Sequence, residues 1–147
     1  MKYYQGYYKP INPEKYLGDV NNIFYRSRLE LNFFRYIDRH PDVLKWASEE
    51  FHIPYVSPKD GRWHRYFPDV FISMRDKNGV VQQYVIEIKP DAQTKPPKMG
   101  KTKKAKKRFM YESVTYAVND AKWKYAEEFC RKRGLVFKKM TEKDIPY

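Results

Sequence analysis

Hydrophobic residues recur at helical spacing in two stretches of this chain. In the first stretch, Leu29, Phe33, Phe34 and Ile37 lie three or four residues apart, which places them on one face of a helix. A proline follows at once, and proline disfavours the helical conformation in the residue before it. The pattern therefore predicts a helix over residues 27–40 with one apolar face.

The second stretch predicts a longer helix near the end of the chain. Its apolar face is formed by Tyr111, Val114, Val118, Ala121, Tyr125 and Phe129. Gly134 follows this stretch and suits the left-handed position just after a helix. A further short helix is predicted over residues 41–50, because proline is well tolerated in the first helical turn.

Apolar runs bounded by turn-forming residues predict four strands, which cover residues 51–56, 65–74, 80–89 and 135–140. Strands and helices in this order predict the fold class α/β, in the form of an α+β mixed sheet flanked by helices. The chain shows no internal repeat. We therefore expect a single domain over residues 21–147, preceded by an N-terminal arm, residues 1–20, that is rich in tyrosine and punctuated by proline.

Composition excludes several classes of protein. Hydrophobic residues make up 41% and aromatic residues 18% of the 147 residues, which is enough for a core and argues against disorder of the whole chain. No apolar run approaches the roughly 20 residues that span a bilayer, so we expect no membrane partner. The single cysteine, Cys130, cannot form an internal disulfide, which fits a reducing compartment.

Positive charge is concentrated in one window, residues 95–108. The formal net charge of the chain is +12, and this window has no acidic residue. Its prolines, its glycine and its repelling like charges predict a flexible basic loop. We expect this loop to contact the phosphates of nucleic acid, whereas a solvated loop that only aids solubility is the alternative. The candidate DNA-binding residues are Lys95, Lys98, Lys101, Lys103, Lys104, Lys106, Lys107 and Arg108.

Residues 76–79 (DKNG) join two predicted strands in a hairpin, and the register of this hairpin decides which side chains meet. A two-residue turn at the Asn-Gly pair would mix polar and apolar side chains on both faces. A three-residue loop that ends in the same glycine, in the left-handed conformation, pairs Val70 with Ile86 and gives one continuous apolar face. We prefer this second register, which places Asp69 directly opposite Glu87.

Two carboxylates that face each other across a strand pair repel unless a positive charge lies between them. A divalent cation such as Mg²⁺ is the natural partner, since it prefers carboxylate oxygens and keeps water positions open for work on a phosphodiester. Lys89, on the same face as Glu87, could pair with the carboxylates, hold the attacking water or offset charge on the phosphate. The alternative, favoured for so short a trio taken alone, is that Asp69, Glu87 and Lys89 form a solvated polar face.

A third acid, Glu30, falls on the apolar face of the first predicted helix. Helical projection places it beside Phe33, Phe34 and Ile37, and an acid on a core-facing stripe needs a partner. A capping box is an equally good explanation, because Ser27 and Glu30 have the spacing at which each bonds the other's backbone amide. The cap and the metal-site interpretations are compatible, and both stay open.

Glu30 on the first predicted helix, residues 67–69 (FPD) and residues 86–89 (IEIK) together resemble the signature of the PD-(D/E)xK nuclease superfamily. More narrowly, residues 25–91, which include 25–30 (YRSRLE), and the tail 134–137 (GLVF) resemble the head-completion nucleases of T-even-like tailed phages. A segment comparable to residues 119–141 adds a more distant resemblance to the endonuclease subunit of heteromeric transposases. The resemblance covers most of the chain and implies a restriction-endonuclease-like core, in which metal-binding acids lie at one edge of a mixed sheet.

The resemblance also implies roles. Asp69 and Glu87 would be metal ligands, Lys89 the catalytic lysine, and Glu30 the helix-borne acid that completes or supports the ion site. The activity implied is a Mg²⁺-dependent DNA endonuclease, with Mn²⁺ able to substitute, that acts on packaged DNA ends during phage head completion. DNA and phage head or neck proteins are the expected partners, and the host cytoplasm during assembly or the virion is the expected location. The alternatives are a non-catalytic DNA-binding structural head protein and the endonuclease subunit of a transposase.

Overall fold

The computed structural model describes residues 4–145 and contains there eight β-strands and two α-helices. The first half of the chain forms β1 (Gly6–Tyr7), β2 (Phe24–Tyr25), α1 (Arg28–Arg39), β3 (Val43–Ser48), β4 (Ile53–Val56) and β5 (Trp63–Tyr66). The second half forms β6 (Val70–Arg75), β7 (Val81–Ile88), α2 (Lys103–Lys132) and β8 (Val136–Met140). Short 3-10 turns lie at Pro13–Lys15 and Asp91–Thr94. The first three residues of the N-terminal arm fall outside the described range.

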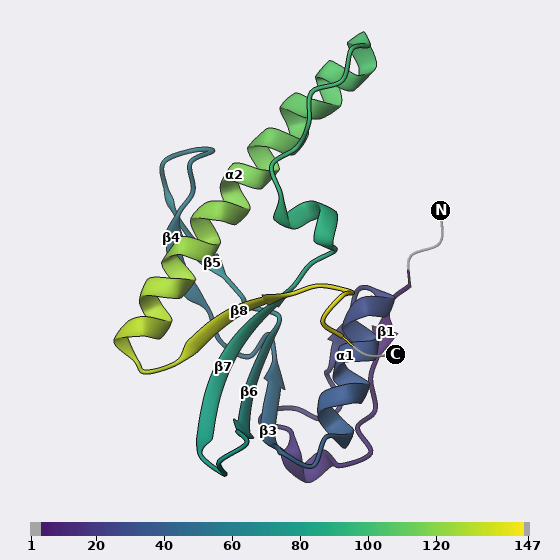
Figure 1. The fold of residues 1–147 in the computed structure, drawn as a ribbon, viewed down its shortest axis with the longest axis vertical. Helices are drawn as coiled ribbons and strands as arrows, with labels where there is room; N and C mark the ends of the chain where they lie inside the picture. Colours follow the sequence, from purple (N-terminus) through teal and green to yellow (C-terminus); the bar gives the residue numbers. More distant parts are fainter. Residues whose placement is uncertain (1–3, 146–147) are drawn as a thin grey trace.

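The central layer is a four-stranded sheet in the order β3-β6-β7-β8. β3, β6 and β7 are antiparallel neighbours and β8 runs parallel to β7, so the predicted mixed sheet is confirmed. β4 and β5 form a separate hairpin beside α2, and β1 and β2 form a third small sheet. Figure 1 shows α1 and α2 flanking the sheet, with the first half of α2 extending well beyond it. None of the helices within residues 4–145 is both long and apolar enough to cross a membrane.

Two hydrophobic clusters fill the space on either side of the sheet. The larger one contains Phe33 and Phe34 of α1 together with Trp46 of β3 and Ile86 of β7. The smaller one lies under α2 and is formed by Ile53, Tyr55, Tyr66 and Ala126, with Phe137 packed against it. α1 packs on β3 of the main sheet, whereas α2 packs on β8 of that sheet and on β4 of the separate hairpin.

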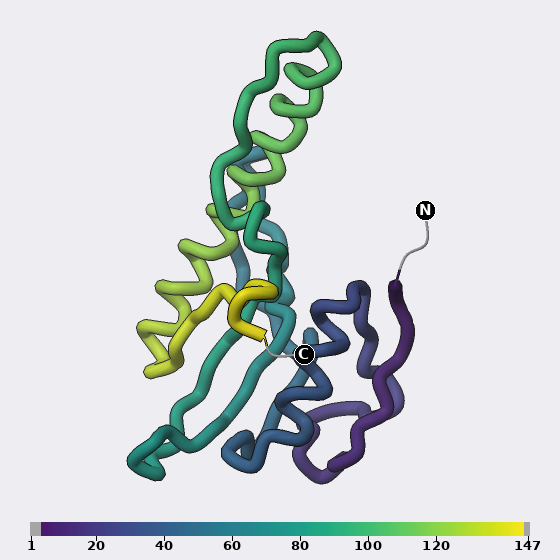
Figure 2. Tube along the Cα trace, turned by 45° about the vertical axis from the view of Figure 1, so that its right-hand side comes forward, coloured from purple at the N-terminus to yellow at the C-terminus, as the bar shows by residue number. Residues whose placement is uncertain are grey.

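The N-terminal arm packs on the α1 side. Tyr8 and Tyr16 are buried in the larger cluster, and the Leu17 amide donates to the Trp46 carbonyl at 2.8 Å. This bond satisfies part of the outer edge of β3, an edge that would otherwise be open to pairing with another chain. Figure 2 shows the arm running alongside α1 before the chain enters that helix.

The β6–β7 hairpin has the three-residue loop preferred from the sequence. Val70 pairs with Ile86, and the Asp76 amide donates to the Val80 carbonyl at 2.8 Å. Gly79 has a φ of +77°, the left-handed conformation that this loop requires. The register prediction is therefore confirmed.

The helix expected over residues 41–50 is wrong, since this segment contains the strand β3. Trp46 pairs with Ile72 of β6, and Val43, Trp46, Ala47 and Ser48 are all buried. A strand covered on both faces does not alternate between polar and apolar residues. The alternation that would have indicated a strand was therefore missing, and pairing with β6 overrode the local helix propensity.

The single strand expected over residues 65–74 is divided in two. Pro68 is fully buried between β5 and β6, and it interrupts the strand because it cannot donate a backbone hydrogen bond. The chain passes there from the β4–β5 hairpin into the main sheet, so Asp69 lies at the start of β6.

Candidate active site

Asp69 and Glu87 meet at the edge of the sheet where β6 begins and β7 ends. The register of the hairpin places them opposite one another, and the Ile88 amide donates to Asp69 Oδ2 at 2.7 Å. Asp69 keeps partial exposure, whereas Glu87 is buried with 6% of its surface exposed. Glu87 is therefore the more deeply buried of the two acids.

Two neighbours hold the Glu87 carboxylate. The Tyr66 hydroxyl at the end of β5 donates to Glu87 Oε2, and Lys89 Nζ lies 3.7 Å from Glu87 Oε1. Lys89 follows one pleat beyond Glu87 and shares its face of the sheet, as the alternation of a strand requires. The structure thus brings together the three residues that the sequence singled out on the hairpin.

The electrostatics of the pair favour protonation while no cation is bound. Burial raises the pKa of Asp69 well above its usual range, and the charge of Glu87 raises it further. Burial also raises the pKa of Glu87, although the Tyr66 hydroxyl and the positive charge of Lys89 act in the opposite direction. The Lys89 ammonium therefore offsets only part of the electrostatic repulsion between the two acids.

Glu30 lies at the start of α1, close to this pair. The Ser27 side chain accepts from the Glu30 amide at 3.1 Å, which is the capping bond expected from the sequence. The Glu30 carboxylate accepts from the Arg26 amide and not from the Ser27 amide, so the capping box is shifted by one residue. Burial is the main cause that raises the pKa of Glu30, and the charge of Lys89 lowers it, so Glu30 both caps the helix and faces the site.

Glu49 is a further acid at this edge that the sequence did not indicate. It directly follows β3, its amide donates to the Asp69 carbonyl at 3.3 Å, and its carboxylate pairs with the Arg26 guanidinium. Its φ of +54° is unusual for a residue other than glycine. Its charge adds to the elevation of the Glu30 pKa, so it belongs to the same electrostatic site.

Tyr66 is a functional candidate that the sequence did not indicate. For Lys122 the sequence left two explanations open, a DNA contact and a surface lysine, and α2 places its ammonium 5.8 Å from the ring centres of both Tyr55 and Tyr66. Burial lowers the pKa of Lys122, and the charge of Glu87 partly restores it. The only available signal was its position on the apolar face of α2, four residues after Val118.

The donor set fits a hard divalent cation. Within residues 4–145 no three acidic, histidine or cysteine side chains converge as a metal cluster. Mg²⁺ does not need such a cage, because it is commonly held by one or two carboxylates together with water and substrate phosphate. Among the described residues Asp69 Oδ1 accepts no hydrogen bond, and the uncompensated repulsion with Glu87 is what a cation would relieve.

The cationic residues of the window 95–108 do not form one loop. Lys95, Lys98 and Lys101 lie in the segment before α2, but α2 itself begins at Lys103, so the predicted loop is wrong beyond that point. The Thr102 side chain caps the helix by accepting from the Ala105 amide at 3.0 Å. Lysine, alanine and arginine are good helix formers, and their propensity outweighs the charge repulsion that favoured a loop. The five helical cations are Lys103, Lys104, Lys106, Lys107 and Arg108, all exposed.

The fold and site define the class of this protein. Two opposed acids and a lysine lie at one edge of a mixed sheet, with a helix on each face, and residues 40–142 match the family model described as "TnsA-like endonuclease N terminal". The chain belongs to this family of endonucleases. The PD-(D/E)xK nuclease resemblance noted from its motifs is confirmed.

A relative with a named role narrows the comparison. The chain is 43% identical over 141 residues to the head completion nuclease of Enterobacteria phage T4, and the match covers 95% of this chain and 91% of that protein. The similarity therefore extends over the N-terminal arm and α1, which precede the part matched by the family model.

Proposed function

We propose that this protein is a Mg²⁺-dependent DNA endonuclease, in which Mn²⁺ can replace Mg²⁺, and that it trims or processes packaged DNA ends during phage head completion. The main support for this chemistry is that Asp69 lies opposite Glu87 across the β6–β7 pair, with Lys89 Nζ 3.7 Å from Glu87 Oε1. Near full-length similarity to a head completion nuclease supports the biological setting.

Each residue of the site has a role in this proposal. Asp69 and Glu87 would hold the cation with support from Glu30, and the cation would offset the charge that develops on the phosphate. Lys89 orients or activates the water for in-line attack, because its ammonium lies beside Glu87 and keeps partial exposure. The Tyr66 hydroxyl fixes the Glu87 carboxylate in place.

The cations of the window 95–108 would supply DNA affinity through phosphate contacts, which add binding energy without selecting a sequence. Low sequence specificity, or targeting by a phage head or neck protein, follows from this arrangement. The action is proposed for the host cytoplasm during assembly, with retention in the virion as a second location.

Two other functions compete with this one. Family membership favours an endonuclease subunit of a transposase, which would need a recombinase partner to direct it. A structural head protein that only binds DNA would use the same fold without catalysis, since a fold does not fix a function. We prefer the head-completion function because the similarity covers almost the whole length of a head completion nuclease.

A plasmid-nicking assay tests the proposal. Purified protein is incubated with Mg²⁺, Mn²⁺ or EDTA, beside the variants Asp69→Ala and Lys89→Ala, and DNA binding is followed by gel shift. We expect nicking that needs the metal and is lost in both variants, with folding and binding near normal. Lys77→Ala, at the exposed hairpin turn, is the matched control and should cleave normally.

Full activity of Lys89→Ala would refute the assigned chemistry. Equal binding by all proteins with no nicking in either metal would favour the structural DNA-binding protein. Nicking that appears only when a recombinase of the transposase type is added would favour the transposase subunit.

A further inference from the structure

A trough runs along α2 from the active site toward the tip of the β4–β5 hairpin. Its volume is about 460 Å³, and it is lined by Lys59, Tyr111, Val114, Val118, Asn119 and Lys122. The α2 members recur at three- and four-residue spacing and so share one face of the helix. Lys122 lies eleven positions after Tyr111 in the sequence, which corresponds to roughly 16 Å along a helix.

One end of the trough is part of the electrostatic site. The half-buried Lys122 places its ammonium 5.8 Å from the ring centre of Tyr66, whose hydroxyl donates to Glu87. Anything that occupies the trough at this end therefore lies next to the proposed catalytic carboxylates. Lys59, in the exposed turn between β4 and β5, adds a second positive charge to the lining.

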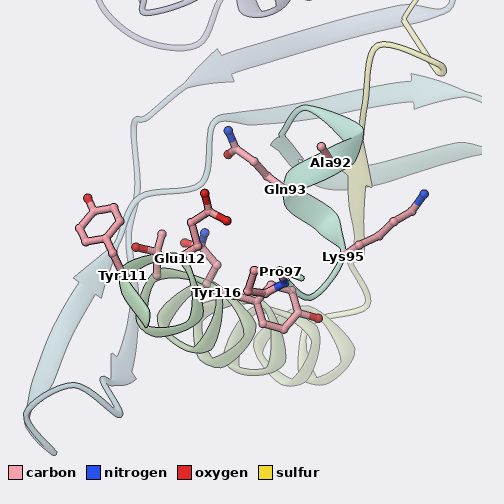
Figure 3. A pocket seen from close by; sticks show the side chains of 9 residues that line it. Ala92, Gln93, Lys95, Pro97, Tyr111, Glu112 and Tyr116 are labelled. Atoms are coloured by element: carbon pink, nitrogen blue, oxygen red, sulfur yellow. The ribbon is translucent and has the colours of Figure 1, made fainter. Parts of the chain in front are cut away.

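The other end presents an aromatic ring to solvent. Tyr111 is 74% exposed, although its helix neighbours Val114 and Val118 form an apolar floor. Tyr111, Thr115 and Asn119 also line an adjoining hollow of about 270 Å³ between α2 and residues 92–97. Figure 3 shows Tyr111 at the end of this second hollow opposite Lys95, and the ring thus lines both hollows.

We propose that this trough binds an unpaired stretch of the substrate DNA strand next to the scissile phosphate, with a base stacked on Tyr111 and phosphates held by Lys59 and Lys122. This inference rests on the proposed nuclease function and names the DNA structure that the site takes. Two lysines, amide and hydroxyl groups and an exposed aromatic ring are the combination that single-strand-binding grooves use.

The size of the trough favours a single strand over a duplex. Hollows of several hundred Å³ are typical of sites that enclose one small ligand. A single strand fits such a hollow, and its unpaired bases can contact the apolar floor of Val114 and Val118, whereas a duplex keeps its bases stacked inside. A DNA end with a single-stranded overhang, or a nicked or flapped junction, supplies such a strand.

Binding in EDTA tests the trough separately from cleavage. Fluorescence anisotropy is measured with a short single-stranded oligonucleotide and with the matched duplex, for the wild type and for Tyr111→Ala, Tyr111→Phe and Lys59→Ala. Tyr111→Ala should weaken single-strand binding about 10-fold, as expected for one lost base–aromatic stack, and change duplex binding less than about twofold. Tyr111→Phe should bind like the wild type, because it keeps the ring.

Tyr36→Ala provides the matched control, since Tyr36 is a partly exposed aromatic residue on α1 outside the trough. It should bind both probes like the wild type. Equal losses for the two probes in Tyr111→Ala, or no loss for the single strand, would overturn the proposal. Because the assay contains no free metal, a protein that binds through Tyr111 but never cuts DNA would refute the nuclease and leave the trough assignment standing.

Discussion

Replacing Asp69 with Asn is expected to stabilise the metal-free protein at neutral pH while it removes cleavage. The wild-type protein places the Asp69 carboxylate opposite Glu87. The charges of Lys89, whose ammonium lies 3.7 Å from Glu87, and of Lys122 compensate this pair only in part. An amide has nearly the shape of a carboxylate and carries no charge. The substitution therefore removes the repulsion without opening a cavity.

The size of this stabilisation follows from the distance that the hairpin register sets between the two carboxylates. Side chains directly opposite on an antiparallel pair lie about 5 Å apart, and two like charges at that distance repel by roughly 3 kcal/mol at an effective dielectric constant of about 20. The hydrogen bond from the Ile88 amide to Asp69 becomes one to a neutral acceptor, which loses about 1 kcal/mol. The net gain is about 1–2 kcal/mol, or roughly 3–7 °C in Tm for a chain of this length.

The gain in stability of Asp69→Asn over the wild type should increase with pH. Asp69 ionises near pH 4 in the unfolded chain, and burial together with Glu87 raises its pKa in the folded protein. The folded state thus holds the proton more tightly, so the stability that this proton confers is complete below about pH 4 and is lost as pH rises through the folded pKa. The advantage of Asp69→Asn should therefore be largest at about pH 8 and vanish toward pH 4.

Thermal unfolding in EDTA across this pH range, followed by circular dichroism, measures the effect. Asp120→Asn is the control, because Asp120 pairs with Lys124 at 2.9 Å on the outer side of α2. It should leave Tm unchanged or slightly lower. Added Mg²⁺ should raise the Tm of the wild type by mass action and have little effect on Asp69→Asn. If Asp69→Asn unfolds at a lower temperature than the wild type near neutral pH in EDTA, the assigned repulsion is wrong.

Three further outcomes are expected. Tyr66→Phe removes a donor that lowers the pKa of Glu87, so the pKa of Glu87 should rise in this variant. The acid limb of the pH–activity profile should then move to higher pH, and an unchanged profile would contradict this. Asp38→Ala leaves three donors without their acceptor, including the Tyr8 hydroxyl at 2.5 Å. It should lower the free energy of unfolding in denaturant by about 3 kcal/mol, and a loss below about 1 kcal/mol would contradict this. Replacing Lys104 and Lys107 together with Ala should lower the slope of log affinity against log salt by about two, and an equal slope would exclude phosphate contact.

The part of the site on the hairpin could be predicted from the sequence because one of its faces is buried. Only the three-residue loop gives the strand pair a continuous apolar side, and a one-residue slip would expose that side to water. This constraint fixed the pairing of Val70 with Ile86, and with it the opposition of Asp69 and Glu87. Local sequence was sufficient there because the turn and the strands belong to one contiguous segment.

The residues contributed by other elements could not be predicted in this way. Tyr66 reaches Glu87 only because Pro68 turns the chain out of the β4–β5 hairpin, and Lys122 approaches because α2 packs on β4. Glu49 reaches the site through β3, a segment whose composition indicated a helix. These placements depend on contacts between segments far apart in the sequence, which periodicity and turn chemistry do not report.

Two clusters of like charge, one acidic and one basic, go against local electrostatic preference. Asp69 and Glu87 oppose each other without full compensation, and the first turn of α2 has no acidic residue although a helix N-terminus favours negative charge. Each cluster is unfavourable in isolation and would become favourable with the proposed counter-charge, a divalent cation for the carboxylates and a phosphate backbone for the helix. Unfavourable charge clusters of this kind are expected at a functional site, where a bound metal ion and DNA would together relieve the repulsion in both. The proposed substrate, with a metal-bound phosphate at the carboxylates and its strand continuing along α2, would satisfy both.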